Sequence, residues 1–355
     1  MQALQVAAAV GLATLVFLIK SRRNYLQLPA LPVHSGPPPE DFMVVIPARN
    51  EEKNIGRAVS SFRGLPVLVV DDDSSDRTVE IARSAGAAVI SAPPWRPGLM
   101  GKPNACQAGA HASDSRWILF VDADTYYTAE FVPSLIHYAE TENLIAASVF
   151  LRQERVTLFE RMLLPYAFAL YFCGVDARQA NNPRSPEALA NGQCLLFRRD
   201  AYQFIGGHKA VSGSVIEDVA LAQLLKRHRM QARILRAENM GAVRMYDGFG
   251  AIWRGFQKNS FRFLLVNPWS GIQVVLASIL LTSYIPVLAW LWSEQQWIAA
   301  AIFAILPGLV LWPWYGGPEA LLLAPLAVYC FQVIALNGMA TTIFGRKAIW
   351  KGRRV

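Results

Sequence analysis

The segment WILFVDAD, residues 117–124, decides the fold. Its first five residues are apolar, as in a short buried strand, and the strand is followed by Asp122, Ala123 and Asp124. Two carboxylates one residue apart at a strand end can present oxygens to a hard divalent cation, which in turn can neutralise a diphosphate. Alone, such a pair is also typical of a solvated loop. The other motifs of the chain are therefore needed to distinguish a cation site from a loop.

Short apolar segments alternate with helical segments before this strand. The expected strands are residues 43–47, 67–70, 87–90 and 117–121, and the expected helices are residues 51–62, 78–85 and 102–112. This alternation predicts an α/β fold with a parallel sheet. Ligands of such sheets bind at the carboxyl ends of the strands, and the acidic clusters at 71–76 and 122–124 both follow a strand. The pattern therefore indicates a nucleotide site.

The chain is too apolar for an ordinary soluble enzyme. It has 355 residues, of which 53% are hydrophobic and 17% charged. Residues 4–19 form one apolar stretch, about long enough to cross a bilayer with its flanks. Basic residues follow this stretch (Lys20, Arg22 and Arg23) and none precedes it, which favours a retained anchor with an external N-terminus over a signal peptide.

Most of the remaining apolar residues lie near the C-terminus. Candidate membrane segments are residues 271–292, 297–315 and 319–343, and the tail after them carries five basic residues, so it is expected in the cytoplasm. If the central domain is also cytoplasmic, three crossings would place the tail outside. Either one segment is re-entrant or interfacial, with the proline-containing 297–315 the suspect, or the tail breaks the positive-inside tendency.

These features divide the chain into five expected parts. They are an N-terminal membrane anchor (1–22), a Pro-rich linker (23–40), a catalytic domain (41–265), C-terminal membrane helices (266–345) and a basic tail (346–355). Within the domain, the apolar run 162–175 is too short to span, and it is either a core helix or an interfacial helix. The polar residues 176–190 are expected to form a mobile loop.

Charge and cysteine content narrow the partners. The net charge is +8, and the clusters beside the apolar segments supply eight basic residues, so anionic lipid explains the basicity and no nucleic acid is expected. The four cysteines have no C-x-x-C spacing, which fits a reducing compartment and neither a disulfide scaffold nor a zinc site. The oligomeric state leaves no mark in the sequence.

Five motifs follow one another in a fixed order: VIPARNE (45–51), VDDDSSD (70–76), GKPNA (101–105), DAD (122–124) and IEDV (216–219). This order resembles the family 2 glycosyltransferases over residues 40–265. The resemblance implies the GT-A nucleotide-sugar-binding fold, with a mixed, mostly parallel sheet, here flanked by N- and C-terminal transmembrane helices.

The resemblance also implies roles around the donor. Asp72 is expected to contact the nucleotide base, although its neighbours Asp71 and Asp73 leave that assignment open by one position. Lys102 is expected near the phosphates. The residues expected to line the base pocket are Pro47, Ala48 and Glu51.

The remaining motifs supply a cation site and a base. Asp124, helped by Asp122, is expected to hold Mg²⁺ or Mn²⁺, and Asp218, supported by Glu217, is expected to deprotonate the acceptor. The chemistry itself asks for such a set. Negative charge develops on a departing diphosphate, and a hydroxyl nucleophile must lose its proton to a nearby carboxylate. Attack from the opposite face inverts the anomeric configuration.

A closer resemblance comes from the second half. The segments are ANGQCLLFRR (190–199), IGGH (205–208), RMY (244–246), GFQKN (255–259) and WKGR (350–353). They are similar to those of membrane-bound carotenoid and lipid glucosyltransferases, such as the chlorobactene and diaponeurosporenoate groups. The resemblance implies that Gly192 and Gln193 lie near the donor sugar or the acceptor and Lys258 near the diphosphate.

Two departures bear on the acceptor. Relatives often carry Trp where this chain has Asn104, and QKNSF (257–261) replaces their Q/R-x-x-R-W element. Both argue against a processive polysaccharide synthase and favour a single transfer to a lipid.

The sequence therefore predicts an inverting glycosyltransferase that moves a sugar, with glucose expected, from a UDP-sugar to a carotenoid-like lipid. It is expected in the inner (plasma) membrane as a multi-pass protein with a cytoplasmic catalytic domain. A polyprenyl phosphate, a hopanoid, or a glycerolipid or sphingolipid are alternative acceptors. A non-catalytic nucleotide-sugar-binding membrane protein is a further alternative.

Overall fold

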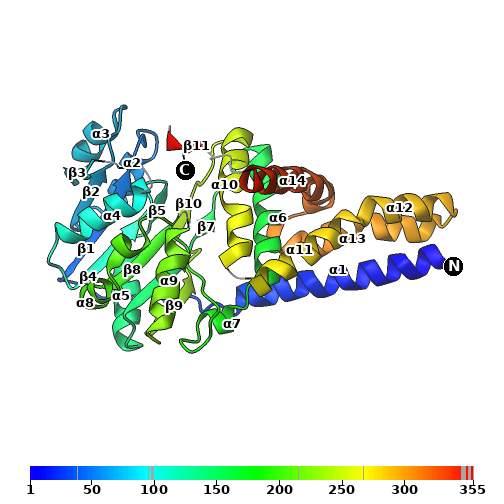
Figure 1. Ribbon diagram of the computed structural model, residues 1–355, viewed down its shortest axis with the longest axis horizontal. Coiled ribbons are helices and arrows are strands. Elements are labelled where there is room, and N and C mark those ends of the chain that lie inside the picture. The colour runs from blue at the N-terminus through cyan, green and yellow to red at the C-terminus, as the bar shows by residue number, and fades with distance from the viewer. Residues whose placement is uncertain are drawn as a thin grey trace. The chain divides into compact units, whose positions relative to one another are not determined.

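The computed structural model of the protein describes residues 1–37, 39–94, 96, 100–214, 216–266, 268–344, 349–350 and 353–354. Its contacts divide the chain into two units, drawn in Figure 1. The globular unit comprises Leu28–Glu154, Gln179–Met245 and Ile349–Val355, and the helical unit comprises Met1–Gln27, Arg155–Arg178 and Tyr246–Ala348. These units differ from the expected parts of the chain. Residues 155–178 and 246–265, which were expected in the catalytic domain, belong to the helical unit.

The globular unit is built on a seven-stranded sheet with the order β3-β2-β1-β4-β8-β6-β9. Its strands are β1 (Phe42–Ala48), β2 (Val67–Asp71), β3 (Ala88–Ser91), β4 (Trp117–Val121), β6 (Ala146–Phe150), β8 (Cys194–Arg198) and β9 (Ala232–Arg236). Strand β8 runs antiparallel to both of its neighbours, and the other pairs are parallel. A mixed, mostly parallel sheet is thus confirmed. A small second sheet contains β5 (Thr125–Tyr127), β10 (Gly241–Val243) and β7 (Arg152–Gln153).

Helices cover both faces of the large sheet because strand side chains alternate between them. In β1, Val44 and Ile46 pack with α2 (Ile55–Ser60), α3 (Thr78–Ser84) and α5 (Phe131–Thr141). Val45 faces the other way, toward α4 (Gly101–His111), α8 (Arg199–Phe204) and α9 (Glu217–Arg227). Every strand and helix expected between residues 43 and 121 is present, with ends shifted by a few residues.

The Pro-rich segment is not a free linker. Helix α1 (Gln2–Leu26) continues past the expected end of the anchor, and the chain after it pairs with the sheet. The Leu31 N–H donates to the Arg236 carbonyl at 2.8 Å, and the Arg236 N–H donates to the Pro29 carbonyl at 2.8 Å. Proline lacks only the N–H, so its carbonyl can still extend an edge strand.

Residues 176–190 differ from the expected loop in the same way. They contain the short helix α7 (Ala177–Ala180), followed by the buried side chain of Asn181. The Asn181 carboxamide donates to the Ile234 carbonyl at 3.1 Å and accepts from the Ile234 N–H at 2.7 Å. The Arg233 guanidinium also donates to the Asn181 carbonyl at 3.2 Å, so both the side chain and the backbone of Asn181 bond to β9.

The helical unit consists of α1, α6 (Leu158–Gly174), α10 (Phe249–Val266), α11 (Pro268–Thr282), α12 (Tyr284–Ser293), α13 (Trp297–Tyr315) and α14 (Ala320–Ile343). Among the described residues, four segments are long and apolar enough to cross a membrane: Gln2–Leu26, Pro268–Ser293, Trp297–Tyr315 and Ala320–Thr341. The tail strands β11 (Ile349–Trp350) and β12 (Arg353–Arg354) pair with each other and group with the globular unit.

Helix α6 holds the apolar run 162–175, for which two interpretations were open. It begins with a capping box in which Thr157 and Glu160 bond each other's backbone N–H groups. Its buried face packs on α1, where the Ser21 hydroxyl donates to the Ala169 carbonyl at 2.5 Å and the Asn24 amide donates to the Phe172 carbonyl at 2.9 Å. The run therefore belongs to the helical unit and not to the core of the sheet.

Candidate active site

The loops that leave β1 and β2 interlock at the carboxyl ends of these two strands. The Asp72 N–H donates to the Ala48 carbonyl at 2.8 Å, and the Arg49 guanidinium donates to the Asp72 carbonyl at 2.5 Å. The Glu51 N–H donates to the Thr78 hydroxyl at 2.7 Å. These bonds bring together the four residues expected around the nucleotide base: Pro47, Ala48, Glu51 and Asp72.

The three consecutive aspartates have different surroundings. Asp71 accepts the Ser74 N–H at 3.3 Å and so closes its own turn. Asp72 is buried. Asp73 has a left-handed backbone (φ 62°) and an exposed side chain, 3.5 Å from the Arg49 guanidinium. The exposure of Asp73 and the turn made by Asp71 leave Asp72 as the carboxylate held inside this group of loops.

Lys102, at the start of α4, joins three separate chain segments. Its Nζ lies 2.6 Å from Asp122 Oδ1 and 3.2 Å from Glu217 Oε1, and it donates to the Gly192 carbonyl at 3.0 Å. Burial works to lower the pKa of the amine, but the two carboxylates outweigh it and raise the pKa well above its usual value. Lys102 is therefore a permanent positive charge at the strand edge.

Asp218 lies in the first turn of α9, next to this cluster. Its Oδ2 accepts the Gly192 N–H at 2.7 Å, and its Oδ1 accepts the Val219 N–H at 2.8 Å. Burial, and then the negative charge of Glu217, raise its pKa to about 6, while Lys102 acts in the opposite direction. A carboxylate with this pKa is ionised at neutral pH and is a stronger base than an ordinary aspartate.

Gly192 and Gln193 connect the cluster to the end of β4. A Cβ on Gly192 would lie 3.1 Å from Lys102 Nζ and 3.2 Å from Asp218 Oδ2, so a side chain there would press on both charged groups. The Gln193 carbonyl accepts the Asp122 N–H at 3.2 Å, and its buried side chain accepts from the Asn191 amide at 3.0 Å. The structure thus brings Lys102, Asp122, Gly192, Gln193, Glu217 and Asp218 together.

The second aspartate of the pair, Asp124, lies where β4 passes into the small sheet. Its carbonyl accepts the Arg244 N–H at 3.1 Å. Among the described residues, no three Asp, Glu, His or Cys side chains come together as a metal cage. Mg²⁺ beside a nucleotide is usually held by one or two carboxylates together with phosphate oxygens and water, so Asp124 with Asp122 fits such an ion.

Lys258 and His208 belong to other elements of the structure. Lys258 is in α10 of the helical unit, and its side chain lies outside the described residues. His208 is buried, 2.8 Å from the Tyr202 hydroxyl and edge-on to the Phe120 ring. Burial lowers its pKa to about 3, so its imidazole is neutral and packs as part of the core.

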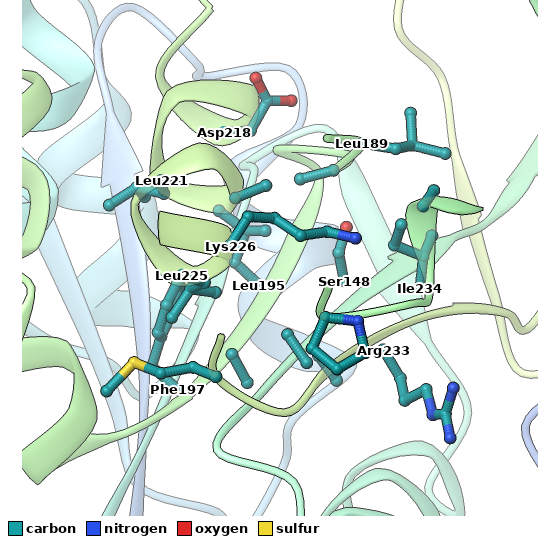
Figure 2. A pocket seen from close by; sticks show the side chains of 18 residues that line it. Ser148, Leu189, Leu195, Phe197, Asp218, Leu221, Leu225, Lys226, Arg233 and Ile234 are labelled. Atoms are coloured by element: carbon teal, nitrogen blue, oxygen red, sulfur yellow. The ribbon is translucent and has the colours of Figure 1, made fainter. Parts of the chain in front are cut away.

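A pocket of about 480 Å³, part of it open solvent, lies between α9 and the sheet (Figure 2). Most of its lining is apolar, with Leu221, Leu225 and Phe197 among it, and Asp218 is at one end. The Asp218 carboxylate points away from the other lining side chains, as Figure 2 shows. Its hydrogen bond to the Gly192 N–H holds it on the side of Lys102, so the carboxylate does not face the apolar interior of this pocket.

This mixed sheet thus carries, at one edge, a lysine paired with two carboxylates and a third carboxylate beside them. The model of the family described as glycosyl transferase family 2 matches residues 43–206, and the curated relatives of this chain are glycosyltransferases, so the chain is a glycosyltransferase. It is 27% identical to the 4,4'-diaponeurosporenoate glycosyltransferase of Staphylococcus haemolyticus over 71% of this chain and 69% of that enzyme. The Staphylococcus aureus enzyme of the same name is 29% identical over 68% of this chain and 65% of its own length.

A solved structure supports the fold. The mannosyltransferase of Pyrobaculum calidifontis, solved in complex with GDP-Man and Mn²⁺, is similar with a TM-score of 0.61. The similarity covers 98% of this chain and 99% of that one at 16% identity. The globular unit is therefore GT-A-like, as the motif order predicted.

Two residues of the site were quoted in motifs but given no role from the sequence. Arg49 bonds the Asp72 carbonyl, and Asn191 bonds both the Gln193 side chain and, through its N–H, the Ser148 hydroxyl at 2.7 Å. Each is adjacent to a residue that was assigned, and this adjacency was the available signal. Asp72, however, follows β2, and Ser148 lies in β6, and the sequence alone does not bring these residues to Arg49 and Asn191.

Proposed function

We propose that this glycosyltransferase moves a hexose, with glucose expected, from a UDP-sugar to a hydroxylated or carboxylated carotenoid-like lipid at the cytoplasmic face of the inner membrane. The observation that carries the proposal is the Asp218 carboxylate, held against the Gly192 N–H beside the cluster of Lys102, Asp122 and Glu217. One charged edge of the sheet thereby offers both a base and a cation.

The lipid acceptor is supported by two further observations. The staphylococcal relatives are named for diaponeurosporenoate, a carotenoid-type acceptor. This chain also has four segments long and apolar enough to cross a membrane among its described residues. A water-soluble acceptor would not need the enzyme to be embedded.

The chemistry follows from the positions of the groups. An acceptor hydroxyl beside Asp218 gives its proton to the carboxylate while its oxygen bonds the anomeric carbon. The bond from that carbon to the donor phosphate breaks, its electron pair leaves with the nucleoside diphosphate, and the configuration inverts. Lys102 places positive charge where the leaving group becomes more negative.

The donor side rests on the first two loops and on the aspartate pair. Asp72, with Pro47, Ala48 and Glu51, would receive the base of the nucleotide. Asp124, with Asp122, would hold Mg²⁺ or Mn²⁺, which when bound supplies charge neutralisation at the diphosphate. Lys258 would contribute a further positive charge to the diphosphate, as the family resemblance implies.

Other acceptors make a different demand on Asp218. A polyprenyl phosphate and a carboxylated carotenoid are already ionised and need no base, whereas a hydroxylated carotenoid, a hopanoid or a glycerolipid offers a hydroxyl and does need one. Activity that survives Asp218→Asn would therefore favour an ionised acceptor, a phosphate or a carboxylate. A non-catalytic protein would bind the nucleotide without releasing it from its sugar.

Expression in a carotenoid-producing bacterium tests the proposal. Wild type is compared with Asp218→Asn and with Asp114→Asn, a matched change at an exposed aspartate, and the extracted lipids are measured by mass spectrometry. A hydroxylated carotenoid heavier by one hexose is expected with wild type and with Asp114→Asn only, whereas a hexosylated carboxylated carotenoid is expected in all three strains. No hexosylated carotenoid in any strain would overturn the carotenoid acceptor, and no labelled lipid from UDP-glucose in isolated membranes would overturn this donor and lipid pair.

A further inference from the structure

Helix α6 cannot cross a bilayer, because both of its ends connect to the globular unit. Only residues 155–157 precede it after Glu154, and only residues 175–178 follow it before Gln179. A single crossing of the hydrocarbon, about 30 Å thick, would leave its two ends on opposite sides. Helix α6 therefore lies on the membrane side that holds the globular unit, and its exposed Leu158 and Phe159 suit the edge of the hydrocarbon.

The second half of α14 packs against α6 and is hydrogen-bonded to α10. The Phe331 ring lies 5.5 Å from the Tyr166 ring of α6 and 5.0 Å from the Phe256 ring of α10. Further along, the Gln257 side chain donates to Asn337 Oδ1 at 2.7 Å. Helix α10 begins at Phe249, directly after the last residues of the globular unit, so this half of α14 also lies near that side.

Helices α1 and α13 run side by side in the same direction. Near the start of α1, Ala3 and Ala7 share a core cluster with Phe303, close to the start of α13. At the other end, the Tyr25 ring lies 5.3 Å from the Trp314 ring. Since α1 continues into the globular unit, α13 ends on the same membrane side as that unit.

Helices α11 and α12 run in the direction opposite to that of α1 and α13. Helix α11 begins beside α6, where the Ser270 carbonyl approaches Gly174. Helix α12 ends at the far end of α1, where Leu291 joins the cluster of Ala3 and Ala7. The chain thus leaves through α11 and α12, turns at residues 294–296, and returns through α13.

After these two passages the chain is back on the side of the globular unit, and the tail strands belong to that unit. A further crossing by α14 would put the tail on the wrong side. We propose that α14 does not cross the membrane but lies obliquely in the leaflet next to the globular unit, together with α6 and α10. In Figure 1, α14 lies beside α6 and α10, whereas α1 and α12 extend away from them.

The partner of this surface is the acyl chains of that leaflet. The four most exposed apolar side chains described in α14 follow helical spacing on one face: Leu322, Leu326, Val333 and Leu336. Its opposite face is buried in the bundle through Ala324, Ala327 and Phe331. The face defined by these four residues, about 21 Å long at 1.5 Å per residue, would lie among lipid tails on the side where the sugar is transferred. The inference does not depend on which lipid accepts the sugar.

Protease accessibility of short epitopes in the full-length enzyme tests the topology. One epitope follows Val355, one is inserted after the exposed Arg63 of the globular unit, and one is inserted at Glu294 in the α12–α13 turn. Each is digested in spheroplasts and in inverted membrane vesicles, with lipid glucosylation as a check on folding. We expect the Val355 and Arg63 epitopes to be cut only in inverted vesicles and the Glu294 epitope only in spheroplasts. Digestion of the Val355 epitope together with the Glu294 epitope would overturn the proposal.

Membrane depth gives a second test that does not rely on the tail. Nitroxides are placed at Leu322→Cys and Leu336→Cys on α14, and at Leu12→Cys and Leu26→Cys on α1, an exposed pair with the same separation. An upright helix separates either pair by about 21 Å in depth. We expect nearly that difference on α1 and less than half of it on α14, measured by collision with oxygen and a nickel chelate. Equal differences on the two helices would show that α14 spans.

Discussion

The Gly192 N–H donates a hydrogen bond of 2.7 Å to Oδ2 of Asp218. This contact joins the segment before β8 to the first turn of α9 and aims the carboxylate toward Lys102, away from the apolar pocket. With the Val219 N–H on the other oxygen, the carboxylate is oriented before any acceptor arrives. Such preorganisation is what a base at this position requires.

Replacing Asp218 by Asn should remove the base while keeping the shape of the side chain. Transfer to a hydroxyl acceptor should fall by about 10² to 10⁴-fold, the usual contribution of a general base. The measurement is initial rates in membranes supplied with UDP-glucose and acceptor lipid, with Asp114→Asn as control. A rate within threefold of wild type would contradict the assignment of Asp218 as base.

The acid limb of the pH profile should report Asp218. Its pKa is about 6, so the fraction of ionised base, and with it kcat/KM, should fall as the pH drops through about 6. The charge of Glu217 helps to raise this pKa. Glu217→Gln should therefore move the midpoint to lower pH, and an unmoved midpoint would mean that the limb belongs to another group.

Lys102→Met should act in the opposite sense. Lys102 lowers the pKa of Asp218, so its loss should move the same midpoint to higher pH. The rate on the plateau of the pH profile, where Asp218 is fully ionised, should also fall by about 10² to 10³-fold, because the positive charge beside the leaving group is removed. Lys102→Arg, which keeps the charge, should leave the midpoint close to that of wild type. A downward shift in Lys102→Met would refute the electrostatic reading of the cluster.

Gly192→Ala tests the close packing between the two charged groups. The new Cβ would lie 3.1 Å from Lys102 Nζ and 3.2 Å from Asp218 Oδ2, so one of them must move. A displacement below 1 Å at a reacting group can cost about 10 to 100-fold in rate. Gly250→Ala in α10 is the control, because its Cβ meets only the flexible Arg254 side chain. Equal rates for both variants would show that the close packing of Lys102 and Asp218 around Gly192 does not matter for the rate.

The strands of the fold were predictable because each must bury both faces. VVIP in β1, VLVV in β2 and WILFV in β4 are continuous apolar runs, and the structure has strands at all three. The acidic motifs that follow them could therefore be placed at one edge. The edge pairing of the Pro-rich segment was not predictable, because composition indicates the missing N–H of Pro29 and not its remaining carbonyl, which accepts the Arg236 N–H.

The ion pairs inside the site were not predictable from the order of the motifs along the chain. Lys102 meets Glu217 only because α4 and α9 cover the same face of the sheet, and residues 103–216 separate them in the chain. The membrane segments show the same limit. Residues 297–315 were suspected of not crossing because of their prolines, whereas the contacts of α14 with α6 and α10 point to the last helix instead.

Metal dependence is the final prediction, and it separates the roles of the two aspartates. Asp122 already neutralises Lys102 at 2.6 Å, so it serves the cluster even without a cation. If Asp124 is the main ligand, a chelator should abolish transfer, Mg²⁺ or Mn²⁺ should restore it, and Asp124→Ala should remain inactive at any metal concentration. Asp122→Asn should lose part of the rate yet still respond to metal. The readout is transfer rate against free metal, and full activity of wild type in chelator would contradict the site.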